Sequence, residues 1–198
     1  MNINHINTDE LIIPDDIWGA IWEEQKKLHE QYKSVEIANN LGYALVKNRP
    51  FNLNDRNWQY YLKDLAYRVI EELAEAQEAK DLNQEVHCIE EEIDALHFLV
   101  ELNVVIKQSL VINSYSPYNP VISYWPIVYN LGLAGNCLKI KPWKQDPQLT
   151  DTTKYRAYIN RATSELMETL RLNLSDKEIY KIYMKKNKVN QFRLRSKY

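Results

Sequence analysis

Two pairs of acidic residues in this chain have the spacing that places both members on one face of a helix. The first pair is Glu72 and Glu75, and the second is Glu91 and Asp94. Residues three positions apart in an α-helix are neighbours on its surface. If two such helices face each other, four carboxylates meet, and they repel strongly unless cations neutralise them. Because Mg²⁺ prefers oxygen ligands, the two pairs predict a magnesium site.

The segments that carry these pairs have helical composition. Residues 55–80 contain no Gly or Pro and are rich in Leu, Ala, Glu and Arg, which favour helix. A second helix is expected from about residue 84 to residue 107, with Asn83 as its N-cap. At about 1.5 Å per residue, both pairs lie roughly 9–17 Å from the turn between the two segments. An antiparallel helix hairpin would therefore bring the pairs to nearly the same level.

The second of these helices is apolar on two sides. One side carries Ile89, Ile93, Leu96 and Val100. The opposite side carries the carboxylates of Glu91 and Asp94 together with Phe98, Leu102 and Val105. A face that is simply solvated would not carry those apolar residues. Since a buried carboxylate without a partner is costly, this face favours a metal site over a solvated acidic surface.

Composition limits the class of protein. The 198 residues are sufficient for one substantial core, so a single domain over residues 1–198 is expected. A net charge of −2 indicates no nucleic-acid partner, and no glycine-rich phosphate loop is present. No apolar run approaches a membrane span, so no membrane partner is expected. The isolated Cys88 and Cys137 have no zinc spacing, and the N-terminus shows no secretory pattern, which together favour a cytoplasmic protein.

The remaining periodic segments are also helical, and the predicted class is an all-α helical bundle. Further helices are expected over about residues 15–38, 124–139, 152–172 and 175–189, the last opening with a capping box at Ser175 and Glu178. Residues 111–148 are rich in Pro, Tyr and Trp, and their aromatic side chains could belong either to the core or to a cover over a ligand.

Two further features could recognise a ligand. Lys186, Asn190 and Arg193 recur at four- and three-residue steps, so they share one face of the last helix. An ammonium, an amide and a guanidinium on one face suit phosphate and hydroxyl groups, although a basic C-terminal helix is also common without a ligand. Gln25 lies along an otherwise apolar stripe, where it is either a hydrogen-bonded core amide or a group that recognises a ligand.

Together these motifs resemble the dimeric all-α dUTPase family, within the MazG-like nucleotide pyrophosphohydrolases. The matching segments are Glu71-Glu72-Leu-Ala-Glu75, Glu91-Glu92-Ile-Asp94-Ala-Leu-His97-Phe98 and Tyr183-Met-Lys-Lys186-Asn187-Lys-Val-Asn190-Gln-Phe-Arg193. The resemblance implies a homodimer that hydrolyses dUTP to dUMP and pyrophosphate. It also implies Mg²⁺ as the cofactor.

The resemblance assigns a role to each of these residues. The metal ligands would be Glu72, Glu75, Glu91 and Asp94. Catalysis would rest on Glu72 and Glu75. Of these we take Glu72 as the base that activates the attacking water, because it is the carboxylate nearest the edge of the predicted core. The substrate would be bound by Gln25, Lys186, Asn187, Asn190 and Arg193, with Gln25 reading the base.

Three alternatives remain beside this interpretation. The family usually has a Trp-Lys element between the two carboxylate motifs, whereas here Pro142-Trp143-Lys144 follows the second motif. The base preference could therefore be for dCTP, or broader. A di-iron bundle would need two Glu-x-x-His pairs, and only the imperfect pair of Asp94 and His97 is present. A helical oligomer or regulator without enzymatic activity is the third alternative.

Overall fold

The computed structural model describes residues 11–112, 123–139 and 149–196 of the chain. In these ranges it forms six α-helices, one 3₁₀ turn and no strand, which confirms the all-α class. The elements in chain order are α1 (Ile17–Ala38), η2 (Gly42–Leu45), α2 (Arg56–Asp81), α3 (Glu85–Val105), α4 (Trp125–Cys137), α5 (Thr152–Arg171) and α6 (Asp176–Ser196).

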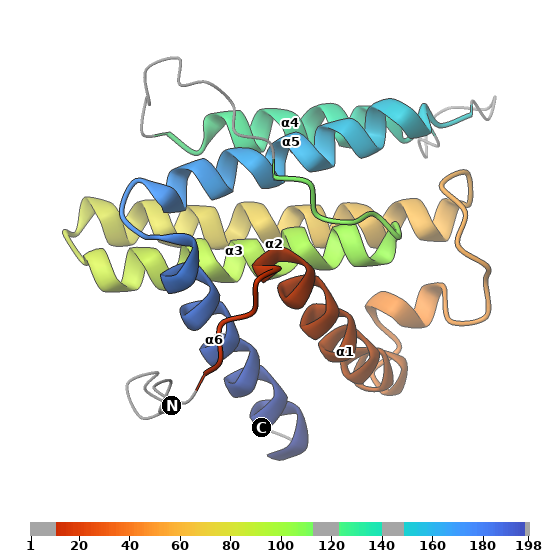
Figure 1. The fold of residues 1–198 in the computed structure, drawn as a ribbon. Coiled ribbons are helices and arrows are strands. Elements are labelled where there is room, and N and C mark those ends of the chain that lie inside the picture. Colours follow the sequence, from red (N-terminus) through yellow and green to blue (C-terminus); the bar gives the residue numbers. More distant parts are fainter. Residues whose placement is uncertain (1–10, 113–122, 140–148, 197–198) are drawn as a thin grey trace.

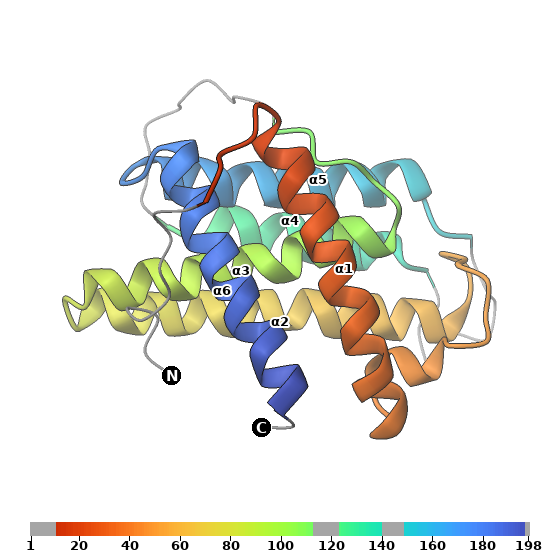
Figure 2. The same cartoon turned by 60° about the horizontal axis from the view of Figure 1, so that its bottom comes forward.

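The helices form three layers. Helices α2 and α3 lie side by side and antiparallel in the middle layer, joined by a short turn (Figure 1). Helices α4 and α5 pack together on one side of this hairpin, and α1 and α6 cross it on the other (Figure 2). Helix α3 contacts α1, α2, α5 and α6, so it is the central helix of the bundle. The expected antiparallel hairpin is therefore confirmed.

The burial of α2 and α3 follows the spacing of their apolar residues. The apolar stripe of α2 is buried and consists of Trp58, Leu62, Leu65, Val69, Leu73 and Ala76. Helix α3 is buried on both of its sides, with Ile93, Leu96 and Val100 on one side and Leu102 and Val105 on the other. Any polar side chain on the inner half of α3 therefore lies between packed layers, where it needs a partner.

Two helix starts differ from the sequence expectation. Helix α1 begins at Ile17, because the side chain of Asp16 accepts a hydrogen bond from the backbone N–H of Gly19 and caps the helix. Helix α3 has Gln84 at its N-cap, whereas Asn83 adopts a left-handed backbone with φ 57°. Asn tolerates that conformation better than most residues, so Asn83 makes the tight turn of the hairpin instead of capping α3.

Helix α6 is longer than predicted, and the extension matters for the site. Its start is as expected, since the backbone N–H of Ser175 donates to Glu178 Oε2 at 2.7 Å and the N–H of Glu178 donates to Ser175 Oγ at 3.4 Å. The helix continues to Ser196 instead of ending near Val189. No Gly or Pro interrupts it, and Arg193 and Arg195 lie in the last turn, where cations favour a helix end.

The aromatic region before α5 is described only in part. Helix α4 confirms the helix that was expected near residues 124–139. The Pro142-Trp143-Lys144 element lies outside the described residues, as do residues 113–122 and the first ten residues. No helix in the described ranges is both long enough and apolar enough to cross a membrane.

Candidate active site

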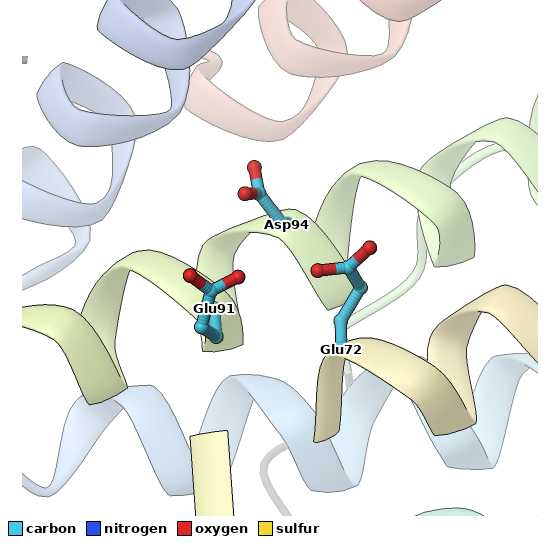
Figure 3. A group of neighbouring side chains, drawn as sticks. All are labelled: Glu72, Glu91 and Asp94. Atoms are coloured by element: carbon cyan, nitrogen blue, oxygen red, sulfur yellow. The ribbon is translucent and has the colours of Figure 1, made fainter. Parts of the chain in front are cut away.

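Three of the four predicted acidic ligands converge where α2 faces α3. One carboxylate oxygen from each of Glu72, Glu91 and Asp94 lies within 4.8 Å of the others. Figure 3 shows Glu72 reaching from α2 towards the two α3 residues. Oxygen ligands on opposite sides of a Mg²⁺ ion are about 4.2 Å apart, at about 2.1 Å from the metal. The cluster therefore fits a hard divalent cation after small side-chain adjustments.

Burial and mutual repulsion make this cluster unfavourable without a cation. Burial, followed by the charges of Asp94 and Glu91, raises the pKa of the Glu72 carboxyl to about 8. Burial likewise raises the pKa of Asp94 to about 6. The Glu91 side chain is only 10% exposed and lies 3.1 Å from Nδ1 of His87. A bound cation would favour the charged forms of Glu72 and Asp94.

Glu75, the fourth predicted ligand, lies outside the group that meets within 4.8 Å. Its side chain is exposed, on the part of α2 that turns away from the buried stripe. It is nevertheless close enough for its charge to raise the pKa of Glu72. Its proposed roles as ligand and catalytic residue thus remain predictions.

Helix α6 brings a cation to the acidic cluster. Nζ of Lys186 lies 2.5 Å from Oδ2 of Asp94, and both side chains are largely buried, at 13% and 22% exposure. This ion pair partly opposes the effect of burial on the pKa of Asp94. The pair joins α6 to α3, so the basic motif near the C-terminus and the second carboxylate motif belong to one site.

A cavity of about 280 Å³ opens beside the cluster. It is bordered by α1, α2, α3 and α6, and the residues that line it are Gln25, Leu28, Tyr32, Glu36, Leu65, Arg68, Glu72, Asp94, His97, Phe98, Glu101, Asn190 and Arg193. The predicted substrate-binding residues Gln25, Asn190 and Arg193 are therefore brought together with two of the predicted metal ligands. Asn187 is not at the cavity: it is fully buried, and its Oδ1 accepts a hydrogen bond from Gln191.

Gln25 is held in a buried hydrogen-bond network at the cavity wall. Its Oε1 accepts from the hydroxyl of Tyr183 at 2.7 Å and lies 2.9 Å from Nδ1 of His97. Its Nε2 donates to Oε2 of Glu101 at 3.4 Å, and the other oxygen of Glu101 lies 2.9 Å from Nδ1 of His29. The network joins α1, α3 and α6. Gln25 is thus both a satisfied core amide and a cavity residue.

His97 is a member of this network and not a metal ligand of the cluster. Its ring stacks on Tyr183 with centroids 3.8 Å apart. Burial, together with the charge of Lys186, lowers its pKa to about 3, so the ring is neutral. A neutral imidazole has one N–H, and Nδ1 is the nitrogen that faces the acceptor Oε1 of Gln25. The di-iron interpretation gains no second His ligand among the described residues.

Comparison with known proteins decides the family. A family model described as dUTPase matches residues 77–198. The chain belongs to the all-α dUTPase family. This dUTPase hydrolyses dUTP, and its all-helical fold over the described residues agrees with the family. Searches of curated proteins and of solved structures gave no match.

The match covers only part of the site of this dUTPase. It includes Glu91, Asp94 and the basic face of α6, but it begins after Glu72 and Gln25. Those two residues are connected to the matched part by geometry, since Glu72 meets Asp94 and Gln25 meets Tyr183. The candidate site therefore combines residues inside and outside the matched segment.

Sequence reasoning missed several residues of the dUTPase cavity. Arg68 and Glu36 line it from ordinary polar positions of amphipathic helices, and Tyr32 lines it from the predicted apolar side of the first helix. Glu101 had a recognisable signal, because it interrupts the most apolar run of the chain, from Phe98 to Ile106. An acidic residue in such a run must have a buried partner.

Proposed function

We propose that this dUTPase binds dUTP in the cavity and hydrolyses it to dUMP and pyrophosphate with Mg²⁺ held at the acidic cluster. The proposal depends on one observation: two members of the three-carboxylate cluster, Glu72 and Asp94, line the same cavity as Asn190, Arg193 and Gln25. The carboxylates suit a cation, the guanidinium and amide suit phosphate and sugar oxygens, and Gln25 suits the edge of a base.

The ligands of the metal would be Glu72, Glu91 and Asp94, with Glu75 as the further predicted ligand. When bound, Mg²⁺ would neutralise these carboxylates and withdraw charge from the substrate phosphates. Lys186 contacts Asp94 in the structure, and the charges of Lys186 and Arg193 both act on the Asp94 carboxyl. We assign Lys186, Asn190 and Arg193 to the triphosphate and sugar, where their charges and N–H groups would orient the scissile bond.

Glu72 is the proposed base. It is the only carboxylate that α2 contributes to the three-residue cluster, and it also lines the cavity. A water molecule held by Glu72 would attack phosphorus, and its proton would pass to the Glu72 carboxylate as the bond to the leaving phosphate oxygen breaks. Glu72 would act as the base in its ionised form, which a bound cation favours.

Magnesium removal and return test this proposal directly. EDTA should abolish dUTP hydrolysis, and Mg²⁺ should restore it. Mg²⁺ should also raise the melting temperature of the metal-free protein, because a ligand present at 100 times its Kd stabilises the folded state by about 2.7 kcal/mol. The measurements are pyrophosphate release and differential scanning calorimetry.

The matched comparison for this experiment uses Asp94→Asn and Asp64→Asn. The first removes a proposed ligand and should eliminate the thermal response to Mg²⁺. The second removes an exposed carboxylate on α2 that pairs with Arg68, and the thermal response should remain. A melting temperature that responds equally to Mg²⁺ in both variants would exclude the acidic cluster as the metal site.

The enzyme is also proposed to be a homodimer. The support is the family resemblance together with exposed apolar side chains on the surface of the single chain. Trp125 and Tyr129 of α4 are 67% and 52% exposed, with ring centroids 6.4 Å apart. Sedimentation equilibrium should give twice the mass of the 23.5 kDa chain. A monomer at micromolar concentration would contradict this part of the proposal.

A further inference from the structure

The side-chain amide of Gln25 has only one kind of group left to offer a ligand. An amide oxygen accepts two hydrogen bonds, and Oε1 of Gln25 already faces the hydroxyl of Tyr183 and Nδ1 of His97. Its nitrogen carries two N–H groups. Among the described residues, only Glu101 accepts from that nitrogen. The remaining hydrogen-bonding capacity of Gln25 is therefore an N–H donor.

Glu101 is the residue that prevents the side-chain amide of Gln25 from flipping. If the amide rotated by half a turn, Oε1 would face the carboxylate of Glu101, and two acceptors would meet. Tyr183 and His97 could adapt to a rotated amide, since a hydroxyl can also accept and a neutral imidazole can change tautomer. A carboxylate has no proton to donate. Because Glu101 is only 5% exposed, water cannot relieve such a contact.

The second oxygen of Glu101 is held as well. It lies 2.9 Å from Nδ1 of His29, a residue that follows Gln25 by one turn of α1. Both side chains are 6% exposed. Glu101 thus has a partner for each oxygen, Gln25 for one and His29 for the other. The polarity of the Gln25 amide is set by a buried arrangement that reaches from α1 across α3 to α6.

We infer that Glu101 locks the Gln25 amide so that it presents an N–H donor to the base, which selects a base carbonyl over an amino group. This inference rests on the proposed function, in which Gln25 reads the base. Uracil carries a carbonyl oxygen at C4, whereas cytosine carries an amino group there. An amino group facing a fixed N–H donor places two donors together, and neither finds an acceptor. Glu101, Tyr183 and His97 are therefore positioning residues that determine the preference for dUTP over dCTP.

The test compares kcat/KM for dUTP with kcat/KM for dCTP in single-residue variants. The wild-type enzyme should prefer dUTP. Glu101→Gln keeps the shape of the side chain, but its amide can present either its oxygen or its nitrogen to Gln25. The ratio of kcat/KM for dUTP to kcat/KM for dCTP should therefore fall about tenfold or more, because one misdirected buried hydrogen bond costs that much. Tyr183→Phe frees one lone pair of Oε1 and keeps the stacked ring, so the ratio should fall by about threefold.

A ratio separates positioning from damage to the fold, because general damage lowers both values together. Glu23→Gln is the matched control: it makes the same chemical change on an exposed side chain of α1, two residues before Gln25, and the ratio should not change. Equal wild-type values for dUTP and dCTP would overturn the inference. The inference would also be overturned if Glu101→Gln and Tyr183→Phe both kept the wild-type ratio of kcat/KM for dUTP to kcat/KM for dCTP.

Gln25→Ala distinguishes failure of this inference from failure of the proposed base site. If Gln25→Ala leaves both values unchanged, Gln25 does not read the base, and the proposed site is wrong. If Gln25→Ala removes the preference for dUTP while Glu101→Gln and Tyr183→Phe keep it, Gln25 reads the base and only the lock is wrong. A selective loss of the preference for dUTP in all three variants supports both the role of Gln25 in reading the base and the lock by Glu101.

Discussion

Glu72→Gln is expected to abolish turnover of dUTP while making the metal-free enzyme more stable to heat. Loss of the proposed base should lower kcat by about 10²–10⁴-fold. The same change removes one of three carboxylates that lie within 4.8 Å of one another, so their repulsion falls. The melting temperature without metal should rise by about 2–4 °C, the shift that 1 kcal/mol produces in a domain of this size. Most substitutions of buried polar residues have the opposite effect on stability.

The stabilisation should depend on pH in a defined direction. The folded-state pKa of Glu72, about 8, lies above the ordinary value of 4.5, so the folded protein binds this proton more tightly than the unfolded chain. The wild-type enzyme should therefore lose stability as pH rises from about 4.5 to about 8. Asp94 adds to this loss between its ordinary value of 3.8 and about 6. The difference in melting temperature between Glu72→Gln and wild type should grow from pH 5 to pH 8.

The matched control is Glu71→Gln, which neutralises an adjacent, exposed carboxylate of the same helix. Turnover should be kept in this variant. Melting temperatures are measured in EDTA at several pH values, and turnover in Mg²⁺. If Glu72→Gln retained wild-type kcat, Glu72 would not be the base; if it lowered the melting temperature at pH 8, the carboxylates would not repel one another in the metal-free protein.

Lys186→Met should remove both activity and stability. Lys186 is the ion-pair partner of Asp94, and loss of one partner leaves a largely buried carboxylate without a cation. Breaking a fully buried pair costs about 3–5 kcal/mol, and this pair is partly exposed, so we expect about 2–3 kcal/mol. If Lys186 also contacts the substrate phosphates, kcat/KM should fall by about 10²–10³-fold. Chemical denaturation and dUTP kinetics measure the two effects.

A second substitution separates the two roles of Lys186. The double variant Lys186→Met with Asp94→Asn has no unpaired carboxylate, so it should recover most of the lost stability and remain inactive. Lys188→Met is the control, since Lys188 is an exposed lysine on the same helix. Additive stability losses in the double variant would show that Lys186 and Asp94 are not coupled.

The helices and the buried face of the hairpin could be predicted because they depend on local periodicity. The apolar stripe of α2 and the two-sided apolar character of α3 are visible in the order of residues, and both are buried as expected. On a helical wheel, the same periodicity puts Glu72 near the edge of the apolar stripe of α2 and Glu75 further round the helix. In the structure Glu72 joins the cluster, while Glu75 is exposed. Only the helix ends were displaced, because caps such as Asp16 depend on one hydrogen bond.

Contacts between helices that are far apart in the chain could not be predicted in the same way. Tyr183 and Gln25 are 158 positions apart, and their hydrogen bond depends on how α6 and α1 cross α3. The pairing of Lys186 with Asp94 depends on the same crossing. Crossing angles follow from the packing of whole helix surfaces, so no short motif specifies them.

The order of residues was therefore sufficient for the all-α class, the carboxylate hairpin and the family resemblance, since each depends on spacing along one or two neighbouring helices. The tertiary structure decided which carboxylates lie together, that Lys186 pairs with Asp94, and which hydrogen-bonding group of Gln25 remains available. These last features depend on the directions of side chains across three layers of helices. Direction is a property of the packed bundle, because each buried polar atom takes the partner that its neighbours leave to it.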